Sequence, residues 1–175
     1  MTGIDLSTPS DHEIVMTRVF DAPRELVFAA HTEPEHVKHW WGRGNPLDVQ
    51  MDFRVGGSYR FVEHADGEQY AFRGEYREIQ APERLVQTFE FEGMPGHIAV
   101  ETLVLTEQDG KTTVTSTTRF DTKEDRDGML QSGMADGAEQ SYRALDTYLA
   151  TLRGAPTRTA APGRPSAQGP GKVVR

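Results

Sequence analysis

The segment Tyr70–Gly93, YAFRGEYREIQAPERLVQTFEFEG, determines the fold class because apolar and polar residues alternate in both of its halves. In the first half, Phe72, Gly74 and Tyr76 share one face, and the second half, 84–93, repeats the pattern after an Ala-Pro-Glu turn. Side chains of a β-strand point alternately to its two faces. The segment therefore predicts two antiparallel strands with one face in the core and the other in water.

The same alternation continues on both sides of this segment. The further strand candidates are 13–20 (EIVMTRVF), 47–53 (LDVQMDF), 58–64 (SYRFVEH), 97–107 (HIAVETLVLTE) and 111–120 (KTTVTSTTRF). The turn sequences ADGE and QDG lie between consecutive candidates and are typical of tight hairpins. The sequence therefore predicts one separate first strand, followed later by about six consecutive antiparallel strands.

Two short helices are expected between the first strand and the others. Asp21 is a suitable N-cap for a helix in DAPRELVFAAH, and Pro23 fits its first turn. Residues 33–41, EPEHVKHWW, are expected to form the second helix, which Gly42 and Gly44 end.

The last apolar pattern predicts one long amphipathic helix over residues 123–152. Its apolar residues recur at intervals of three to four, at Leu130, Met134, Ala138, Tyr142, Leu145, Leu149 and Leu152. Such a stripe covers one face of a helix. Gly128, Gly133 and Gly137 weaken the helix by about 1 kcal/mol each relative to Ala. They either allow close approach to the sheet or leave space beside it.

Composition limits the class of protein. The chain has 175 residues, of which 36% are hydrophobic and 26% charged, and this is sufficient for one domain with a core. It contains no Cys, which excludes disulfides, thiolate metal sites and cysteine nucleophiles. We see no apolar run long enough for a transmembrane helix and no signal peptide, so we expect a cytoplasmic location.

The charge is distributed unevenly along the chain. Residues 153–175 carry five basic side chains and no acidic one, are rich in Pro and Gly, and are expected to form a disordered basic tail. Residues 1–11 are expected to be flexible, which leaves a folded domain at 12–152. The rest of the chain carries 14 basic and 27 acidic side chains. A net charge of −13 argues against nucleic acid and anionic membrane as partners.

Five stretches carry a resemblance to a known family. They are RVFDAPRELVFAAHTEPEHVKHWWG, DFRVGGSYRF, FRGEYREIQAPERLVQTFEFEG, DGKTTVTSTTRF and GMADGAEQSYRALDTYL, in this order over residues 14–152. In them the chain resembles the family named for the activator of heat-shock protein 90 ATPase, within the START-related, birch-pollen-allergen-like (SRPBCC) superfamily. The resemblance implies an α+β helix-grip fold. In it a curved six- to seven-stranded antiparallel sheet wraps around one long C-terminal helix, with two short helices after the first strand.

The resemblance leaves several functions open, because the superfamily includes lipid carriers, cyclases, aromatases and co-chaperones. It implies a cavity between the long helix and the sheet that takes a hydrophobic or aromatic small molecule, such as a lipid or a polyketide-like compound. Binding without defined catalysis is our first hypothesis. A cyclase, aromatase or hydrolase using the same cavity is the second, and a protein that regulates a chaperone ATPase is the third. The extra N-terminal domain of the eukaryotic co-chaperone has no counterpart here, which argues against the third.

Strand parity and the helical stripe together predict the cavity lining. The apolar candidates are Met51, Phe53, Phe61, Phe72, Tyr76, Phe89, Phe91 and Leu103 from the strands, and Met129, Met134 and Tyr142 from the helix. Gly74 within a strand leaves further space. The polar candidates for orienting a ligand are Gln87, His97, Glu101 and Ser116. A buried Glu101 would have a raised pKa and act as a base, or it lies at the rim.

The stretch HVKHWWGRGNPL, 36–47, suggests an aromatic gate. Trp40 and Trp41 are adjacent, so on a helix they point about 100° apart. We expect one in the core and the other at the cavity mouth. His36 and His39 lie three residues apart, but no HExxH pattern or Cys ligand accompanies them, so we expect no metal and no cofactor.

The sequence also suggests a homodimer. The seven residues TTVTSTT, 112–118, are uncharged and favour β-structure. We expect them at an edge of the sheet, where they would pair with a second copy of the chain.

Overall fold

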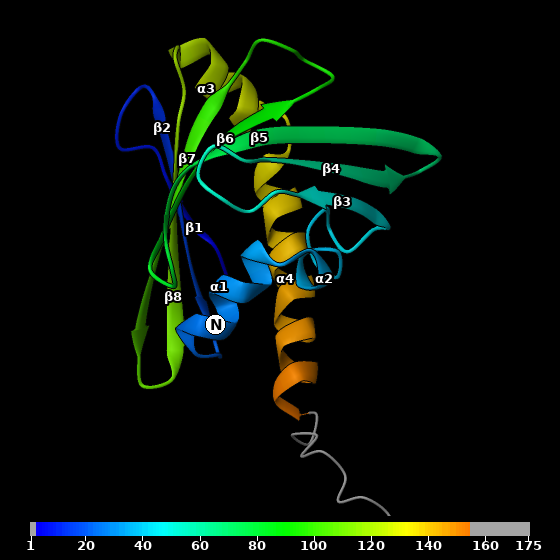
Figure 1. Ribbon diagram of the computed structural model, residues 1–175. Helices are drawn as coiled ribbons and strands as arrows, with labels where there is room; N and C mark the ends of the chain where they lie inside the picture. The colour runs from blue at the N-terminus through cyan, green and yellow to red at the C-terminus, as the bar shows by residue number, and fades with distance from the viewer. Residues whose placement is uncertain (1–2, 155–175) are drawn as a thin grey trace, which may run out of the picture.

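The computed structural model describes residues 3–154. One eight-stranded antiparallel sheet curves around a long helix, in the strand order β1-β2-β8-β7-β6-β5-β4-β3 (Figure 1). The strands are β1 (Asp5–Ser7), β2 (Glu13–Phe20), β3 (Leu47–Met51), β4 (Ser58–Ala65), β5 (Glu68–Gln80), β6 (Arg84–Phe91), β7 (Ala99–Gln108) and β8 (Lys111–Arg119). The helices are α1 (Arg24–Thr32), α2 (Pro34–Val37), α3 (Lys123–Gln131) and α4 (Met134–Gly154). The α+β helix-grip class is confirmed.

The strand order follows from one crossover and a series of hairpins. Strands β3 to β8 each pair with their neighbour in the chain, while α1 and α2 carry the chain from β2 across to β3 at the opposite edge. The turns Asp66-Gly67 and Asp109-Gly110 have positive φ at both residues. That conformation matches the twist of a two-residue hairpin and favours Asp-Gly, so the two predicted hairpins are confirmed.

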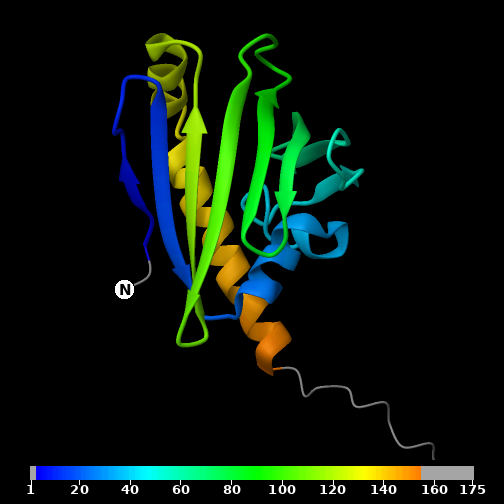
Figure 2. The same ribbon diagram turned by 60° about the vertical axis from the view of Figure 1, so that its left-hand side comes forward.

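The C-terminal region forms two helices, where one was predicted. Instead of one helix over residues 123–152, the structure has α3 and α4, separated at Gly133, whose φ is +84°. A left-handed residue ends a helix, and glycine adopts this conformation without steric cost. Figure 2 shows α4 running along one face of the sheet, with α3 at its upper end. The break allows α3 to cover one end of the sheet while α4 crosses its face.

One prediction about the sheet edges was wrong. Residues 5–7, within the segment 1–11 that we expected to be flexible, form strand β1 and pair with Val15–Thr17 of β2. The segment TTVTSTT in β8 is not an edge, because β2 pairs with it on one side and β7 on the other. Its low charge therefore suits a central strand, and the edges belong to β1 and β3. The dimer that we predicted from this segment loses its basis.

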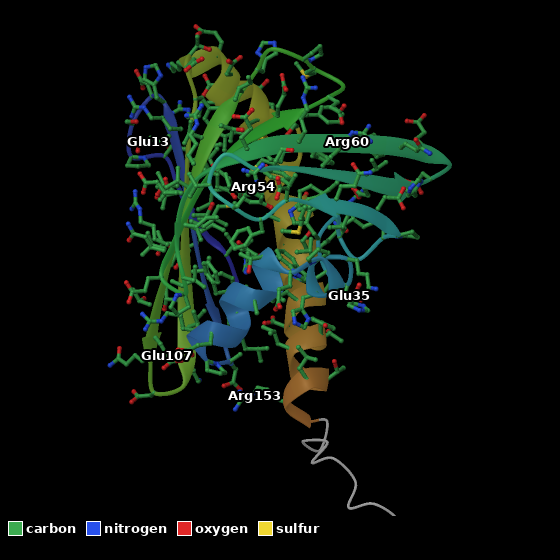
Figure 3. The ribbon with its side chains drawn as sticks, in the orientation of Figure 1. Glu13, Glu35, Arg54, Arg60, Glu107 and Arg153 are labelled. Atoms are coloured by element: carbon green, nitrogen blue, oxygen red, sulfur yellow. The ribbon has the colours of Figure 1, made fainter. Side chains whose placement is uncertain are left out.

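The start of α1 is held by side chains from other elements. Asp21 does not cap the helix, since Pro23 occupies the N-cap position without a side-chain hydrogen bond. The backbone N–H of Arg24 instead donates to Glu107 of β7 at 2.7 Å, and Asp21 pairs with Arg153 of α4 at 2.9 Å. Figure 3 shows Glu107 and Arg153 at the lower end of the molecule. These contacts fix α1 to both the sheet and α4.

The core consists of two clusters of buried side chains. The larger one joins α1 and the middle of α4 to the sheet, with Phe20, Val27, Leu85 and Leu145 almost completely buried. The smaller one contains the following residues: Ile14, Met16, Ala99 and Phe120, with Met129, Leu130, Met134 and Ala138 of α3 and α4 packed against it. The candidate site lies between these two clusters, since its lining takes residues from both.

Candidate ligand cavity

A cavity of about 720 Å³ lies between the concave face of the sheet, α3 and the first half of α4. Its walls come from β4 to β8, from α3 and α4, and from the Trp40–Arg43 segment after α2, with Met16 of β2 and His31 of α1. Pockets for small organic ligands typically measure about 300–1,000 Å³ and are mostly apolar with a few polar groups. The cavity therefore has the volume to hold such a ligand.

A continuous aromatic wall covers one side of the cavity. The Trp41 ring meets Phe61 and Phe72 edge-on, with centroid distances of 5.0 and 4.9 Å. Phe72 in turn contacts Phe89 at 5.6 Å and Phe91 at 5.2 Å. Trp41, Phe72, Phe89 and Phe91 all line the cavity and are only partly buried. Their uncovered surface is therefore available to an apolar ligand.

Trp40 forms a second, more rigid part of the lining. It is buried, and its indole N–H donates to the backbone oxygen of Ala30 at 2.8 Å. Its ring stacks on Tyr142 of α4 with a centroid distance of 5.9 Å. One tryptophan thus lies in the core and the other is partly exposed, and both border the cavity.

A partly buried carboxyl group lines the cavity. Glu101 of β7 is the direct partner of Gln87 on β6, whose side-chain amide donates to Glu101 Oε1 at 3.0 Å. Burial raises the pKa of Glu101, while the hydrogen bond from Gln87 and the nearby Ser116 hydroxyl partly counter this effect. Ser116 Oγ itself makes no hydrogen bond of standard geometry within the described residues. We therefore regard Ser116 as a neighbour of Glu101 and not as a hydrogen-bond partner.

His31 of α1 is a lining residue whose position the sequence did not reveal. Its Nδ1 lies 2.8 Å from the backbone oxygen of Val27, so Nδ1 carries the proton and donates it. Its Nε2 is buried and has no hydrogen-bond partner within residues 3–154. Burial lowers the pKa of His31 to about 4 despite the Val27 bond, so the ring is neutral near pH 7. In the sequence, the spacing of His31 from Val27 and Ala30 could have indicated that it lies on the apolar face of this helix.

The cavity mouth carries charged pairs that the sequence also did not reveal. Arg43, from the segment after α2, bonds Glu63 of β4 at 3.0 Å, and Glu63 is buried. His97 Nδ1 lies 2.7 Å from Asp125 of α3. Arg43 adopts a left-handed backbone with φ +63° in the glycine-rich turn, which directs its side chain toward β4. Arg43 and Glu63 are 20 positions apart in the sequence, so no local sequence pattern indicates that they pair.

Most predicted lining residues border the cavity. These are Trp40, Trp41, Phe61, Phe72, Tyr76, Gln87, Phe89, Phe91, His97, Glu101, Leu103, Met129, Met134 and Tyr142. Met51 and Phe53 do not: Phe53 packs edge-on against Phe28 and Tyr76, at 6.3 and 5.0 Å. Parity gave these two residues the correct face, but the edge near β3 is covered by α1 and α2.

Gly74 does not leave space in the cavity. A Cβ atom at this position would lie 2.0 Å from the backbone oxygen of Thr88 and 2.5 Å from the Tyr59 ring. The Tyr59 hydroxyl fills this place and donates to the same oxygen at 2.6 Å. Glycine is therefore required for the close approach of β4 and β6 around β5.

The remaining histidines of the Trp-rich stretch pack against the last helix. His36 Nδ1 lies 2.5 Å from the Tyr148 hydroxyl, and the His39 ring stacks on Tyr148 at 4.6 Å.

Among residues 3–154, no three His, Asp or Glu side chains are arranged to hold a metal ion. In the same range, no helix has both the length and the apolar character needed to cross a membrane.

Comparison with known proteins agrees with this architecture. The model of the family described as activator of Hsp90 ATPase homolog 1-like protein matches residues 21–150. The chain belongs to this family. Its members need not share one activity, so the family leaves the ligand open.

Solved structures extend the likeness over most of the chain. A protein from Rhodobacter sphaeroides is 28% identical, with a TM-score of 0.78, over 85% of this chain and 99% of the other. One from Staphylococcus epidermidis is 27% identical, with a TM-score of 0.70, over 84% and 94%. One from Mycobacterium smegmatis, 24% identical with a TM-score of 0.75 over 85% and 99%, supports the fold alone. Among curated proteins, no match is found.

Proposed function

We propose that this protein binds a hydrophobic or aromatic small molecule in the cavity between the sheet and α4. The observation that carries the proposal is the aromatic wall around Trp41 and Phe72, which remains partly uncovered inside a cavity of about 720 Å³. Protein cores are packed with few voids larger than a water molecule, so uncovered rings around a space of this size are typical of a ligand-binding cavity. Burial of such rings by a ligand would contribute about 25 cal/mol per Å² of apolar surface.

A cyclase, aromatase or hydrolase is the second candidate, and one observation favours it. Glu101 is a partly buried carboxyl group with a raised pKa that lines the cavity, which is the environment of a general acid or base. Binding of a ligand is a precondition for this activity. A regulator of a chaperone ATPase is suggested by the description of the family and would use the outer surface.

Intrinsic fluorescence offers a direct test, because both tryptophans of the chain border the cavity. The purified full-length protein is titrated with fatty alcohols, fatty acids, fatty amines and aromatic polyketide-like compounds. We expect a saturable change in tryptophan emission with at least one apolar compound. No saturable change over the whole panel would overturn the proposal and direct attention to protein partners.

A matched pair of variants at Gly137 connects binding with the cavity. Gly137 lies on α4 and lines the cavity, and a Cβ atom there would meet only Arg43 Cδ at 3.9 Å. Gly137→Leu therefore fills part of the space without a backbone clash, whereas Gly137→Ala changes the helix propensity alone. We expect loss of ligand binding in the first variant and retention in the second. Equal binding by both would contradict a ligand in this cavity.

A further inference from the structure

Glu101 is a partly buried carboxyl group that has no basic partner within residues 3–154. Its hydrogen-bonding neighbours are the Gln87 amide and, less closely, the Ser116 hydroxyl, both of which are neutral. No ion pair within residues 3–154 includes Glu101. A buried charge is normally paired, because transfer of an ion out of water is costly. The side chain faces the cavity, so a ligand is in a position to supply the missing partner.

The titratable groups around Glu101 do not offer that partner. Tyr59 of β4 and Tyr142 of α4 lie close enough to Glu101 for its charge to raise their pKa values, after burial itself. Both phenols are therefore neutral. Arg18 of β2, which is also near Tyr142, is buried and bonded through both terminal nitrogens to Asp146 of α4. Its positive charge is thus already compensated.

The cavity mouth is also acidic. Among residues 3–154, the cavity is lined by Glu63, Glu124, Asp125 and Asp136 and by one side chain that is always positively charged, Arg43. Arg43 is bound to Glu63, and His97 is bound to Asp125. The uncompensated charge near the opening is therefore negative, which repels an anionic ligand and attracts a cation.

The aromatic wall adds a third feature that favours a cation with an apolar body. The uncovered rings of Trp41, Phe72 and Phe89 belong to the same cavity as Glu101. The face of an aromatic ring attracts an organic cation within about 6 Å of its centroid. The same rings bind an apolar chain or ring by hydrophobic contact.

We infer that the ligand is an apolar or aromatic amine, whose protonated nitrogen pairs with Glu101 while its carbon skeleton lies against the aromatic wall. The inference rests on the proposed ligand-binding function of the same cavity. It excludes fatty acids and other carboxylates as preferred ligands. A neutral alcohol of the same skeleton makes the hydrophobic contacts and one hydrogen bond but lacks the ion pair.

A matched series of ligands tests the inference on the full-length protein. Phenylbutylamine, phenylbutanol and phenylbutanoate share one skeleton and differ only in the polar group. Isothermal calorimetry near neutral pH measures the three dissociation constants. We expect the amine to bind about 30-fold more tightly than the carboxylate, the smallest effect typical of a buried charge pair, with the alcohol between them.

Glu101→Gln identifies the group responsible. The amide has nearly the same shape and still accepts the Gln87 hydrogen bond, so we expect the variant to keep the alcohol affinity and to lose the preference for the amine. Glu124→Gln at the mouth is the matched control, and it is expected to weaken amine binding by only a few-fold, an effect that salt removes. Thermal unfolding of both variants checks that the fold is kept.

The outcomes separate the two proposals. If the alcohol binds but the carboxylate binds as well as the amine, the ligand class is wrong while the proposed cavity binding holds. If Glu101→Gln keeps the full preference for the amine, Glu101 is not the recognition group and the inference is overturned. If no member of the series or of the wider panel binds the wild-type protein, the proposed function itself fails.

Discussion

Two charged side chains near Tyr142, the buried Arg18 and the partly buried Glu101, have opposite environments. Arg18 is bonded to Asp146 at the surface of α4, donates also to the Val19 backbone at 2.9 Å, and lies over the Phe20 ring at 4.8 Å. Glu101 has only neutral neighbours and faces open space. The comparison separates a charge that stabilises the fold from one that the fold leaves available to a ligand.

Removal of Asp146 gives the largest expected effect. Asp146→Ala leaves the Arg18 guanidinium buried without its carboxylate, and loss of one partner of such a pair costs about 3 kcal/mol. Denaturant unfolding at neutral pH measures the change. Arg18→Met removes the buried charge itself, so that Asp146 no longer has a guanidinium to compensate. We expect this variant to lose less stability than Asp146→Ala. Equal losses in both variants would mean that the side-chain volume, not the pairing, stabilises this region.

His31 extends the comparison to a buried group that avoids its charge by losing the proton. Its pKa of about 4 in the folded protein lies below the ordinary value of 6.5, so the unfolded chain binds more protons between these values. Stability from this residue is complete above pH 6.5 and is lost as the pH falls through 4, by up to about 3 kcal/mol.

Thermal unfolding between pH 7 and pH 4 measures this loss. His31→Gln should reduce the dependence of Tm on pH over that interval, because it removes the residue that must otherwise stay neutral in the fold. His39→Gln, at an exposed histidine, is the control. A His31→Gln variant with the wild-type pH profile would show that His31 titrates alike in both states.

Glu101→Gln is expected to raise stability. The folded-state pKa of Glu101 is raised above 4.5, so the carboxyl group costs nothing below pH 4.5 and becomes unfavourable as the pH rises through the folded value. The variant should therefore be more stable than the wild type at neutral pH, and the gain should vanish in acid. Denaturant unfolding at both pH values measures it. A destabilised variant at neutral pH would imply an unrecognised cation beside Glu101.

The sequence predicted the fold and the concave face well because both depend on local periodicity. The alternation of Phe72, Gln87, Phe89 and Phe91 fixes which side chains face inward, and strand order was not needed for that. Parity also placed Glu101 inward. Whether Glu101 was buried or at the rim required the register with β6, which brings Gln87 beside it.

The missed features depend on contacts between distant parts of the chain. Phe53 has the inward parity, but only the crossover of α1 decides that a helix rather than the cavity covers it. The pair of Arg43 and Glu63 needs the left-handed turn after α2, and no periodic signal indicates it. The Thr-rich strand β8 looks like an edge by composition, whereas its central place follows from the return of β2.

Ser116→Ala is the smallest and most selective test of the comparison. Ser116 is buried beside Glu101, and its hydroxyl favours the charged carboxylate without making a hydrogen bond of standard geometry. Its removal should change the free energy of unfolding by less than the roughly 0.5–1.5 kcal/mol of a typical hydrogen bond, because no hydrogen bond of standard geometry is lost. The pKa of Glu101 should nevertheless rise further, which a carboxyl NMR titration of Glu101 would detect. An unchanged titration would leave Gln87 as the residue that stabilises the charged form. Amine binding near neutral pH should weaken in the same variant, since more of Glu101 would hold its proton and be unable to pair with a cation.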